Sequence, residues 1–335
     1  MKNVKKVAIG FLLVVFCAGL VVPAEAAPLR FSFSGQSRPD HAATIMMEGA
    51  AREIYERTEG RVEITVFPAS QLGNWAQVYE NLIRGTVDMA LMSLSADFDP
   101  RFGVLYVNGI VLDYEQVTAV FHPDAWLTQK LNEMSLDLGV RIIGNFVEGF
   151  ISLGSTQPLI EPLNPNVDKG VMTRVPNMEV FITGAEAMGF RTITVPWPDV
   201  FHAVQTGIAE AVIGMAPASA YTMLGDVLNY WYALNYSIES FVFMVSESSW
   251  RQLTPEDQEV FLDVGRRVTL DSIRDAQRMD EHYMARMAER GITVHRFTAE
   301  ELQPIREALV ASWELLVPSM GQDFIDEFTR ELGGF

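Results

Sequence analysis

Residues Gly170–Tyr221 read GVMTRVPNMEVFITGAEAMGFRTITVPWPDVFHAVQTGIAEAVIGMAPASAY. Short β-prone runs alternate here with segments of helical periodicity, which predicts a β-α-β-α-β unit. The first strand is expected to end in Arg174–Asn177, the second to run into Pro196–Pro198, and the third to span Ala209–Met215. An amphipathic helix follows the first strand, and a second helix closes at Gly207. This alternation predicts an α/β fold.

Arg174 is expected at the junction between the first strand of this unit and the helix that follows it. A helix begins with N–H groups that have no partner inside the helix, and a guanidinium beside them is suited to hold an anion. A second interpretation places Arg174 at the surface, where it pairs with Glu179 or Asp199. Spacing alone does not separate the two.

Residues 1–26 have the parts of a secretory signal peptide. The segment has a lysine-rich start, the apolar run Ala8–Val22, and small residues on both sides of Glu25. We expect cleavage after about Ala26. A retained membrane anchor is the alternative, but the apolar run is short for a membrane span. Cys17, the single cysteine, leaves with the signal peptide, and cleavage as a lipoprotein is disfavoured because a bulky phenylalanine precedes it.

The charge balance is strongly acidic. The whole chain has 25 lysines and arginines against 43 aspartates and glutamates, a net charge of -18 at pH 7. Signal cleavage removes three lysines and one glutamate, which leaves the mature chain at about −20. Nucleic acids and anionic membranes attract clustered basic residues, so neither is an expected partner. An anionic ligand would have to be captured by a local positive charge against this field.

The mature chain is too long for one ordinary core, which predicts two domains. The sequence contains no linker rich in Pro, Gly or Ser. Domains without a loose tether are usually joined by crossing strands that form a hinge around a cleft. We assign residues 27–147 plus about 235–275 to domain I, and residues 148–234 plus about 276–335 to domain II.

The first domain is predicted to repeat the β-α-β-α-β pattern, and ligands of such sheets meet the carboxyl ends of strands. Ser34, Asn74, Trp75 and Ser93 stand at those ends and are expected to face the cleft. The remaining expected elements are, in chain order, strands 29–34, 62–67 and 88–92, helices 41–58 and 75–84, strand and turn 97–114, helical 114–139, strand 140–145, a crossing at 146–153, a return strand 235–246, a long helix 254–290, strand 292–297, and helices from 299 and 323.

Motifs for catalysis are absent from the sequence. It contains no phosphate-binding Walker loop, no dinucleotide-binding glycine fingerprint, and no HExxH, GxSxG or CxxC. Its five histidines are scattered singly, and no nucleophile is paired with a base. We therefore expect a binding protein rather than an enzyme, with no cofactor and no metal site.

Several motifs occur in an order that resembles one protein family, the DctP-type periplasmic solute-binding proteins of TRAP transporters. The resemblance extends from Leu29 to about Trp313. The motifs are RVPN at 174–177, WPDVFHAVQTG at 197–207, ERTEGRVEITVFPASQLGNW at 56–75, GTVDMALMS at 85–93, LDYEQV at 112–117 and SESSWRQLTPEDQEVFLDVGRRV at 246–268.

The resemblance implies a two-domain periplasmic binding protein with a hinge and a long helix that spans both domains. Such a protein captures a small organic anion and delivers it to a membrane permease made of a small and a large subunit. It works in the periplasm, with no insertion into the membrane after signal cleavage. Three alternatives stay open: a partner of a sensor system, a binder of a dicarboxylate, and a binder of a neutral solute or a metal–ligand complex.

The resemblance also implies roles for single residues. It places the family's anion-clamping arginine at Arg174 and an aromatic residue over the ligand at Trp197, although Trp197 between two prolines also fits a core position. The chain departs from the family pattern in three places. Ile151 stands where many members have a second arginine, Gly214 and Met215 where an asparagine or an acidic-aromatic pair is usual, and Ser93 where sialic-acid binders have a glutamate.

These departures remove charge from the expected cleft. With one arginine and an apolar wall, the ligand is predicted to be a small monoanion with an apolar part, such as a monocarboxylate or a sulfonate. Glu148 is a further candidate with two interpretations. It is either a cleft acid that receives an amine or hydroxyl of the ligand, or a hinge residue paired with a lysine or arginine across the domains.

Overall fold

The structure is a computed structural model that describes residues 27–332. The predicted signal peptide lies outside the described residues. Within 27–332, none of the helices is both long and apolar enough to span a bilayer.

One mixed sheet of nine strands forms the frame of the molecule, with the strand order β2-β1-β3-β8-β4-β7-β5-β6 and β9 paired to β8. The strands are β1 (Leu29–Gly35), β2 (Val62–Phe67), β3 (Met89–Met92), β4 (Val140–Ser155), β5 (Met172–Val175), β6 (Arg191–Thr194), β7 (Ala211–Met215), β8 (Tyr230–Ser246) and β9 (Thr293–Arg296).

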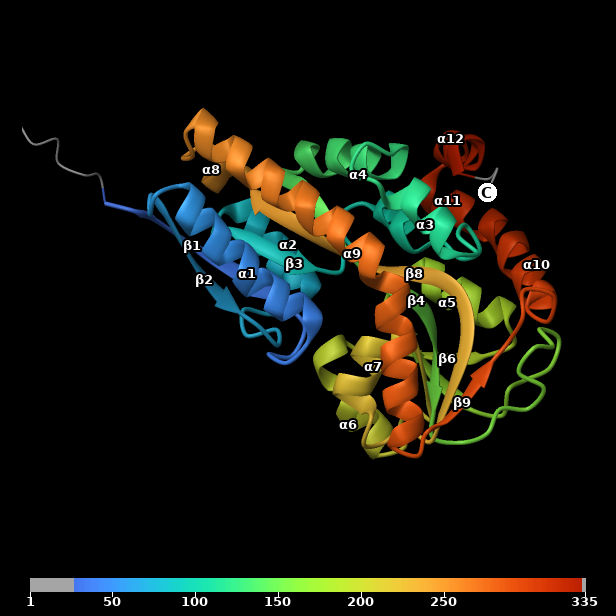
Figure 1. Cartoon of the computed structure of the whole chain (residues 1–335). Helices are drawn as coiled ribbons and strands as arrows, with labels where there is room; N and C mark the ends of the chain where they lie inside the picture. The colour runs from blue at the N-terminus through green and yellow to red at the C-terminus, as the bar shows by residue number, and fades with distance from the viewer. Residues whose placement is uncertain (1–26, 333–335) are drawn as a thin grey trace, which may run out of the picture.

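Helices cover the sheet (Figure 1). They are α1 (Ala42–Arg57), α2 (Trp75–Arg84), η1 (Pro100–Tyr106), α3 (Tyr114–Phe121), α4 (Trp126–Asp137), α5 (Glu179–Ala187), η2 (Trp197–Asp199), α6 (Val200–Gln205), α7 (Pro217–Leu224), α8 (Glu247–Trp250), α9 (Pro255–Glu289), α10 (Gln303–Ala311), η3 (Ser312–Leu316), α11 (Val317–Met320) and α12 (Gln322–Leu332).

The first half of the molecule is built on β1, β2 and β3, which pair in parallel around the central β1. Its helices begin where side chains satisfy the first free N–H groups. The His41 side chain accepts a hydrogen bond from Ala43 N and starts α1. Asn74 and Gln77 form a reciprocal capping box at the start of α2. The β-α-β-α-β pattern predicted for this half is confirmed.

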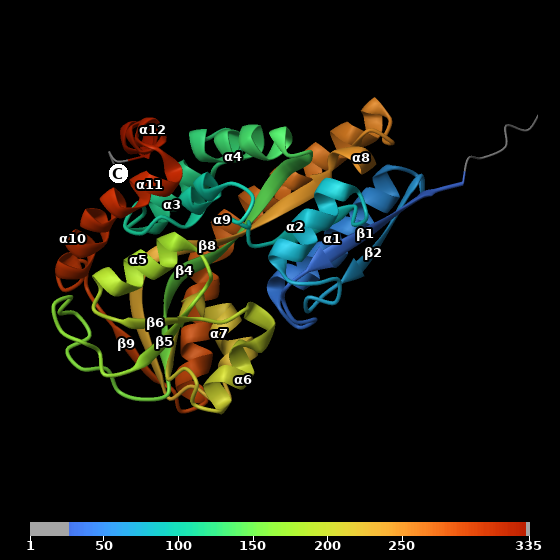
Figure 2. The same ribbon diagram turned by 180° about the vertical axis from the view of Figure 1, so that it is seen from behind.

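The two longest strands connect the halves. β4 and β8 pair antiparallel from Val140 opposite Ser246 to Ser155 opposite Tyr230, with three irregularities in register. Each of these two strands has one end in the first half and the other end in the second half. Helix α9 lies beside them and also extends through both halves (Figures 1 and 2). This long helix begins at the N-cap Thr254, as predicted. Two crossing strands without a loose linker give the hinged two-domain α/β architecture expected from the sequence.

The second half contains the predicted β-α-β-α-β unit. β5 pairs in parallel with β6 on one side and with β7 on the other, and β7 joins the crossing strand β4. Helices α5 and α6 connect these strands. Because parallel strands end at the same edge, the residues that follow β5, β6 and β7 converge at one place.

The C-terminal helices end beside α4, on the side of the molecule away from β1 and β2 (Figure 2). The indole N–H of Trp126 in α4 donates to Glu327 of α12 over 3.1 Å, and Lys130 lies 3.2 Å from the same carboxylate. Helix α10 also contacts α5 of the second half. The assignment of residues 276–335 to domain II, and the other domain boundaries, stay predictions.

One predicted segment is wrong. Residues 97–114 were expected to form strand and turn, but Pro100–Tyr106 form the 3₁₀ helix η1. Asp99 caps this helix by accepting from Arg101 N, and Pro100 fits its first turn. The dense apolar and aromatic residues of the segment, which suggested a strand, are buried in the core on one side of the sheet.

Candidate functional site

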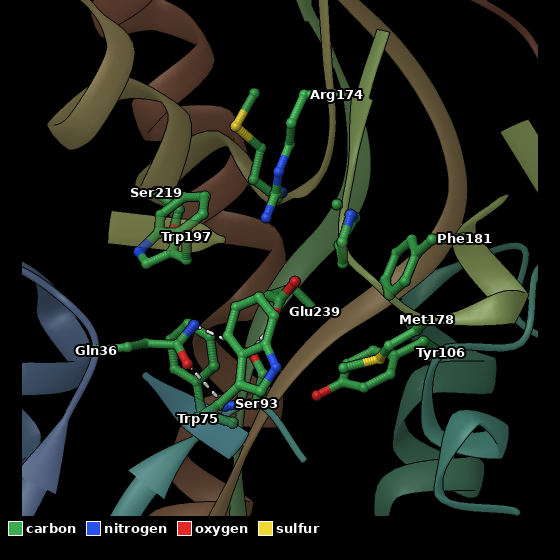
Figure 3. Close-up of a pocket in the computed structure, with 14 residues that line it drawn as sticks. Gln36, Trp75, Ser93, Tyr106, Arg174, Met178, Phe181, Trp197, Ser219 and Glu239 are labelled. Atoms are coloured by element: carbon green, nitrogen blue, oxygen red, sulfur yellow. Dashed lines mark hydrogen bonds between the residues drawn. The ribbon is translucent and has the colours of Figure 1, made fainter. Parts of the chain in front are cut away.

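A cavity lies where the two halves meet, at the carboxyl ends of the parallel strands. The residues that line it come from both halves and from the crossing strand β8 (Figure 3). They are Gln36, Trp75, Ser93, Tyr106, Arg174, Pro176, Met178, Phe181, Trp197, Gly214, Met215, Ser219, Glu239 and Phe241.

Arg174 is the cation of this cavity and is fully buried, with 0% of its surface exposed. Because β5 lies between β6 and β7, backbone carbonyls at the ends of both neighbours reach the guanidinium. Its Nε donates to the carbonyl of Val195 over 2.9 Å, and Nη1 donates to that of Ile213 over 3.4 Å. Its Nη2 is buried without a hydrogen-bond partner. The sheet therefore orients the guanidinium but leaves its Nη2 amino group without an acceptor.

The electrostatics of Arg174 leave it ready for an anion. Burial lowers its pKa to about 9, with Glu239 and Tyr236 acting in the opposite direction, so the guanidinium is still charged at neutral pH. Among residues 27–332 its side-chain hydrogen bonds go to backbone carbonyls, and it is buried rather than exposed at the surface. The alternative interpretation, a surface pair with Glu179 or Asp199, is therefore wrong. The ring of Trp197 lies 5.8 Å from the guanidinium carbon and offers only a cation–π contact.

The backbone around position 214 requires a glycine there, which the sequence alone did not show. Its φ is +90°, and a Cβ there would lie 2.6 Å from Cγ of Pro176. A side chain at 214 would thus push away the proline that follows Val175 at the end of β5. The glycine lets the carboxyl ends of β5 and β7 approach each other beside Arg174.

Glu239 is an ionisable residue of the cavity that the sequence predictions did not include. It lies on β8, is 5% exposed, and its Oε1 accepts a hydrogen bond from Ser93 Oγ over 3.3 Å. Gln36 holds this serine from the other side, because Gln36 Nε2 donates to Ser93 Oγ over 3.0 Å and Gln36 Oε1 accepts from Ser93 N over 2.9 Å. One signal was present in the sequence: Glu239 is a lone acid in the apolar run Ile238–Val245.

The pKa of Glu239 is raised well above its ordinary value. The largest cause is burial, followed by the negative charge of Glu148, while the hydrogen bond from Ser93 and the charge of Arg174 act in the opposite direction. Burial therefore favours the protonated form of Glu239. The sequence predicted a cleft that had lost charge, and the structure adds a second ionisable group, Glu239, which faces the space beside Arg174 (Figure 3).

The rest of the wall is aromatic and apolar. Trp75, Tyr106, Phe181, Trp197 and Phe241 contribute five rings. The free space between them is only about 20 Å³, enough for about one water molecule. A larger outer cavity of about 520 Å³ adjoins it and shares three lining residues with it, Gln36, Trp197 and Ser219. A ligand larger than water must therefore move these side chains or separate the halves to reach Arg174.

Six of the ten predicted site residues line the inner cavity, and four do not. Arg174, Trp197, Gly214, Met215, Trp75 and Ser93 line it. Three of the others have structural roles instead. Ser34 is buried with its hydroxyl 3.7 Å from Met92 Sδ, Asn74 caps α2, and Ile151 is fully buried in the apolar core.

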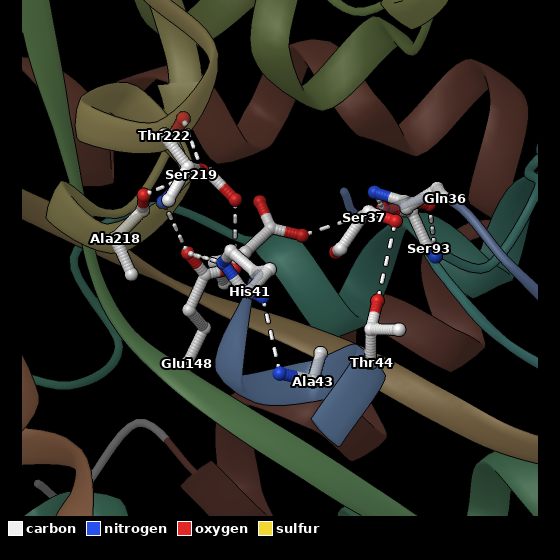
Figure 4. A network of polar contacts seen from close by, with 11 residues as sticks. Gln36, Ser37, His41, Ala43, Thr44, Ser93, Glu148, Ala218, Ser219 and Thr222 are labelled. Carbon is white, nitrogen blue, oxygen red and sulfur yellow. Dashed lines mark hydrogen bonds and ion pairs between the residues drawn. The ribbon is translucent and has the colours of Figure 1, made fainter. Parts of the chain in front are cut away.

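Glu148 is the fourth, and it forms a polar junction between the halves with His41 and Ser219 (Figure 4). Its Oε1 accepts from Ser219 N over 2.8 Å and lies 3.3 Å from His41 Nε2, and its Oε2 accepts from Ser219 Oγ over 3.0 Å. The prediction that Glu148 pairs with a lysine or arginine across the domains is wrong. Its partners are a histidine ring, a serine hydroxyl and a backbone N–H.

Comparison with known proteins gives one family. The family model for bacterial extracellular solute-binding protein, family 7, matches residues 33–317. The chain is 27% identical over 318 residues to the C4-dicarboxylate-binding periplasmic protein DctP of Rhodobacter capsulatus, covering 91% of this chain and 92% of that protein. It is 20% identical over 281 residues to the sialic acid-binding periplasmic protein SiaP of Vibrio cholerae, covering 83% and 85%.

Solved structures share the fold. The sugar acid binding protein DctPAm of Advenella mimigardefordensis, in complex with galactonate, superposes with a TM-score of 0.83 at 19% identity, covering 92% of this chain and 99% of that one. A TRAP periplasmic solute binding protein of Desulfovibrio salexigens with bound orotic acid gives 0.82 at 18% identity, covering 91% and 99%. At this identity the likeness shows the architecture, and the ligands are those of the other proteins.

Proposed function

We propose that this chain, which belongs to family 7 of the bacterial extracellular solute-binding proteins, captures a small organic acid in the cavity around Arg174. It is a binding protein and not an enzyme, as are its relatives and structural neighbours. In this proposal the loaded protein delivers its ligand to the membrane permease of a TRAP transporter, which this polypeptide does not encode. The proteins that it resembles are periplasmic, and we propose the same location here.

The observation that supports this proposal best is the incomplete bonding of Arg174. A buried guanidinium that lacks one partner loses more free energy of hydration than its two carbonyl contacts restore. A carboxylate or sulfonate would accept from the free Nη2 and supply the missing countercharge, and charge-assisted bonds of this kind are short and strong. Closing the halves around the pair would remove water and strengthen it further.

We propose a monoanionic end with an apolar body as the finer ligand class. Two features support it. Arg174 is the only lysine or arginine among the lining residues of the described chain. The walls are aromatic and apolar, so the body of the ligand would pack against rings. Dicarboxylates, the ligands for which the DctP protein of Rhodobacter capsulatus is named, would leave one carboxylate without a cation here.

The route to the site follows from the two cavities. A ligand would enter from the outer cavity, which both halves line, and pass the side chains of Gln36, Trp197 and Ser219. Gln36 follows β1 in the first half, whereas Trp197 and Ser219 belong to the second half. Bending of the crossing strands would therefore open and close this passage.

A thermal-shift screen of the mature protein tests the proposal. The screen compares small monocarboxylates, sulfonates, dicarboxylates and neutral polyols of similar size. A ligand at a hundredfold excess over its Kd stabilises the folded protein by about 2.7 kcal/mol. Stabilisation by monoanions supports the finer ligand class. Hits confined to dicarboxylates would contradict that class, and hits confined to neutral solutes would contradict capture of an organic acid altogether.

A further inference from the structure

Glu239 has a bonding capacity that the protein itself does not use. Its Oε1 has one hydrogen bond, from Ser93 over 3.3 Å, and no hydrogen bond to Oε2 is formed within residues 27–332. The carboxyl group nevertheless lines the inner cavity and faces the same space as Arg174 (Figure 3). Capture of an anion by Arg174 alone gives the Glu239 carboxyl group no partner of opposite charge. A group on the ligand is therefore needed to complete the bonding of both residues.

A positive group on the ligand would change the protonation of Glu239. Burial and the charge of Glu148 oppose ionisation of Glu239, so beside a ligand without a positive group its carboxyl group keeps a proton. A cation next to Glu239 would favour the carboxylate, and Arg174, Glu239 and a zwitterion would then form two opposite-charge pairs with no net charge. The whole chain, at −18, repels ligands with a net negative charge. A zwitterion avoids this repulsion.

The aromatic walls favour a cationic group near Glu239. The faces of tryptophan, tyrosine and phenylalanine rings attract cations, with tryptophan the strongest, and the attraction grows when water is excluded. Trp75, Tyr106 and Phe241 line the cavity together with Glu239, and Trp197 already lies against the guanidinium of Arg174. A hydroxyl or carbonyl on the ligand would bond to Glu239 but would gain nothing from the rings.

We infer that the ligand is a zwitterion, with its anionic group on Arg174 and a positively charged nitrogen held between Glu239 and the surrounding aromatic rings. This inference rests on the proposed capture of an organic acid and narrows it to amino or quaternary-ammonium carboxylates and sulfonates. Gln36 and Ser93 then act as positioning residues, since they hold the Glu239 carboxyl toward the cavity.

The test compares pairs of compounds that differ only by a charged nitrogen. Glycine betaine and 3,3-dimethylbutyrate have the same shape, with a quaternary nitrogen in one and a carbon in the other. Proline with cyclopentanecarboxylate, and 4-aminobutyrate with pentanoate, extend the comparison to other sizes. Isothermal titration calorimetry of the mature protein gives the Kd of each compound. We expect the nitrogen compound of at least one pair to bind at least tenfold more tightly than its carbon partner.

Two variants separate the roles of the two buried glutamates. Glu239→Gln keeps the size and the hydrogen bond from Ser93 but removes the charge, and we expect it to abolish the preference for nitrogen. Glu148→Gln is the matched control, and the preference should persist in it. Loss of the preference in Glu148→Gln alone would overturn the assignment to Glu239.

The outcomes also separate this inference from the proposed function. Equal or tighter binding of the carbon compounds would overturn the zwitterion and leave the capture of organic acids in place. Binding of none of the six compounds, together with monoanion hits in the thermal-shift screen, would have the same meaning. Binding of none of the six compounds, with no hit among monoanions or dicarboxylates in the thermal-shift screen, would contradict both.

Discussion

Two buried glutamates on neighbouring strands of the same sheet differ in how completely their carboxyl oxygens are hydrogen-bonded. Glu148 on β4 and Glu239 on β8 stand side by side in the register, where Gly149 lies opposite Glu239. In the junction of His41, Glu148 and Ser219, both oxygens of Glu148 have partners. In the cavity of Arg174 and Glu239, each ionisable group lacks at least one. A complete set of bonds indicates a structural role, whereas missing bonds that face a shared space indicate a ligand.

The largest expected effect follows from removing the cation of the cavity. Arg174→Met should weaken binding of the best ligand at least a hundredfold, which corresponds to about 3 kcal/mol, because the anion loses its partner in a water-poor site. The same change should leave the empty protein at least as stable as the parent, since a buried charge with incomplete bonding is replaced by an apolar side chain of similar length. Calorimetry and urea unfolding measure the two quantities.

The control for this variant is Arg191→Met on the neighbouring strand β6, where the arginine is exposed and pairs with Asp168 over 3.2 Å. It should change neither affinity nor stability by more than a few tenths of a kcal/mol. Unchanged binding by Arg174→Met would show that Arg174 braces the fold. A marked loss of stability in the same variant would mean that Arg174, like the junction of His41, Glu148 and Ser219, stabilises the fold.

The second effect concerns stability. Glu148→Ala leaves the N–H and hydroxyl of Ser219 and the ring of His41 without their shared acceptor at a buried position. We expect a loss of about 2–3 kcal/mol in the free energy of unfolding, measured with urea. Glu148→Gln retains an acceptor oxygen for Ser219 N and should lose less. Equal losses in the two variants would mean that the charge itself, rather than the hydrogen bonds, holds the halves together.

The contrast between the two glutamates also marks what the sequence was able to predict. Arg174 was identifiable because its role depends on local features: a strand end, the RVPN motif and the helix that follows. Glu239 is 65 residues further along the chain, and its place beside Arg174 depends on the order of four strands and on irregular pairing between β4 and β8. Such long-range register is not encoded in periodicity or motifs.

Ser34 and Asn74 show two further reasons for incorrect expectations. Ser34 and Ser93 both follow the strand-end rule, but successive side chains of a strand point to opposite faces, and only Ser93 lines the inner cavity. Asn74 was overlooked as a cap although Gln77 stands three residues later, which is the spacing of a capping box. The regular elements were predictable to within a few residues, because their periodicity and end signals are local.

Asp280 of α9 is a third buried acid, and its hydrogen bonding is intermediate between that of Glu148 and that of Glu239. It accepts from Phe150 N over 2.8 Å and from the hydroxyl of Tyr114, while its Oδ1 has no partner. Burial raises its pKa to about 8, with Glu148 and Glu281 adding to the effect. The folded protein therefore binds this proton more tightly than the unfolded chain, whose aspartates titrate near 3.9.

The sign of the pH dependence follows from that difference. Stability from Asp280 is fully present below about pH 4 and is lost as the pH rises toward about 8. We expect Asp280→Asn, which has no proton to lose, to flatten the decline in the free energy of unfolding between pH 5.5 and pH 7 by about 2 kcal/mol, because each pH unit in this interval costs about 1.4 kcal/mol. Urea unfolding at both pH values measures it. A decline as steep as that of the parent would mean that the missing bond of Asp280 is satisfied, as in the junction of Glu148.

The smallest effect is expected for Asn74, a predicted site residue to which the structure gives a cap. Asn74→Ala removes the acceptor for Gln77 N, which lies 3.0 Å away, and should lower the free energy of unfolding by about 0.5–1 kcal/mol. Ligand affinity should stay within twofold of the parent, although the next residue, Trp75, lines the cavity. Asn74→Asp, which keeps a side-chain acceptor at the N-cap, should retain the stability. If Asn74→Ala weakened binding more than tenfold while Asn74→Asp did not, the cap would be part of the site through Trp75. Structural residues and ligand-binding residues could then not be separated at α2, because one hydrogen bond would both stabilise the helix and position a residue of the cavity.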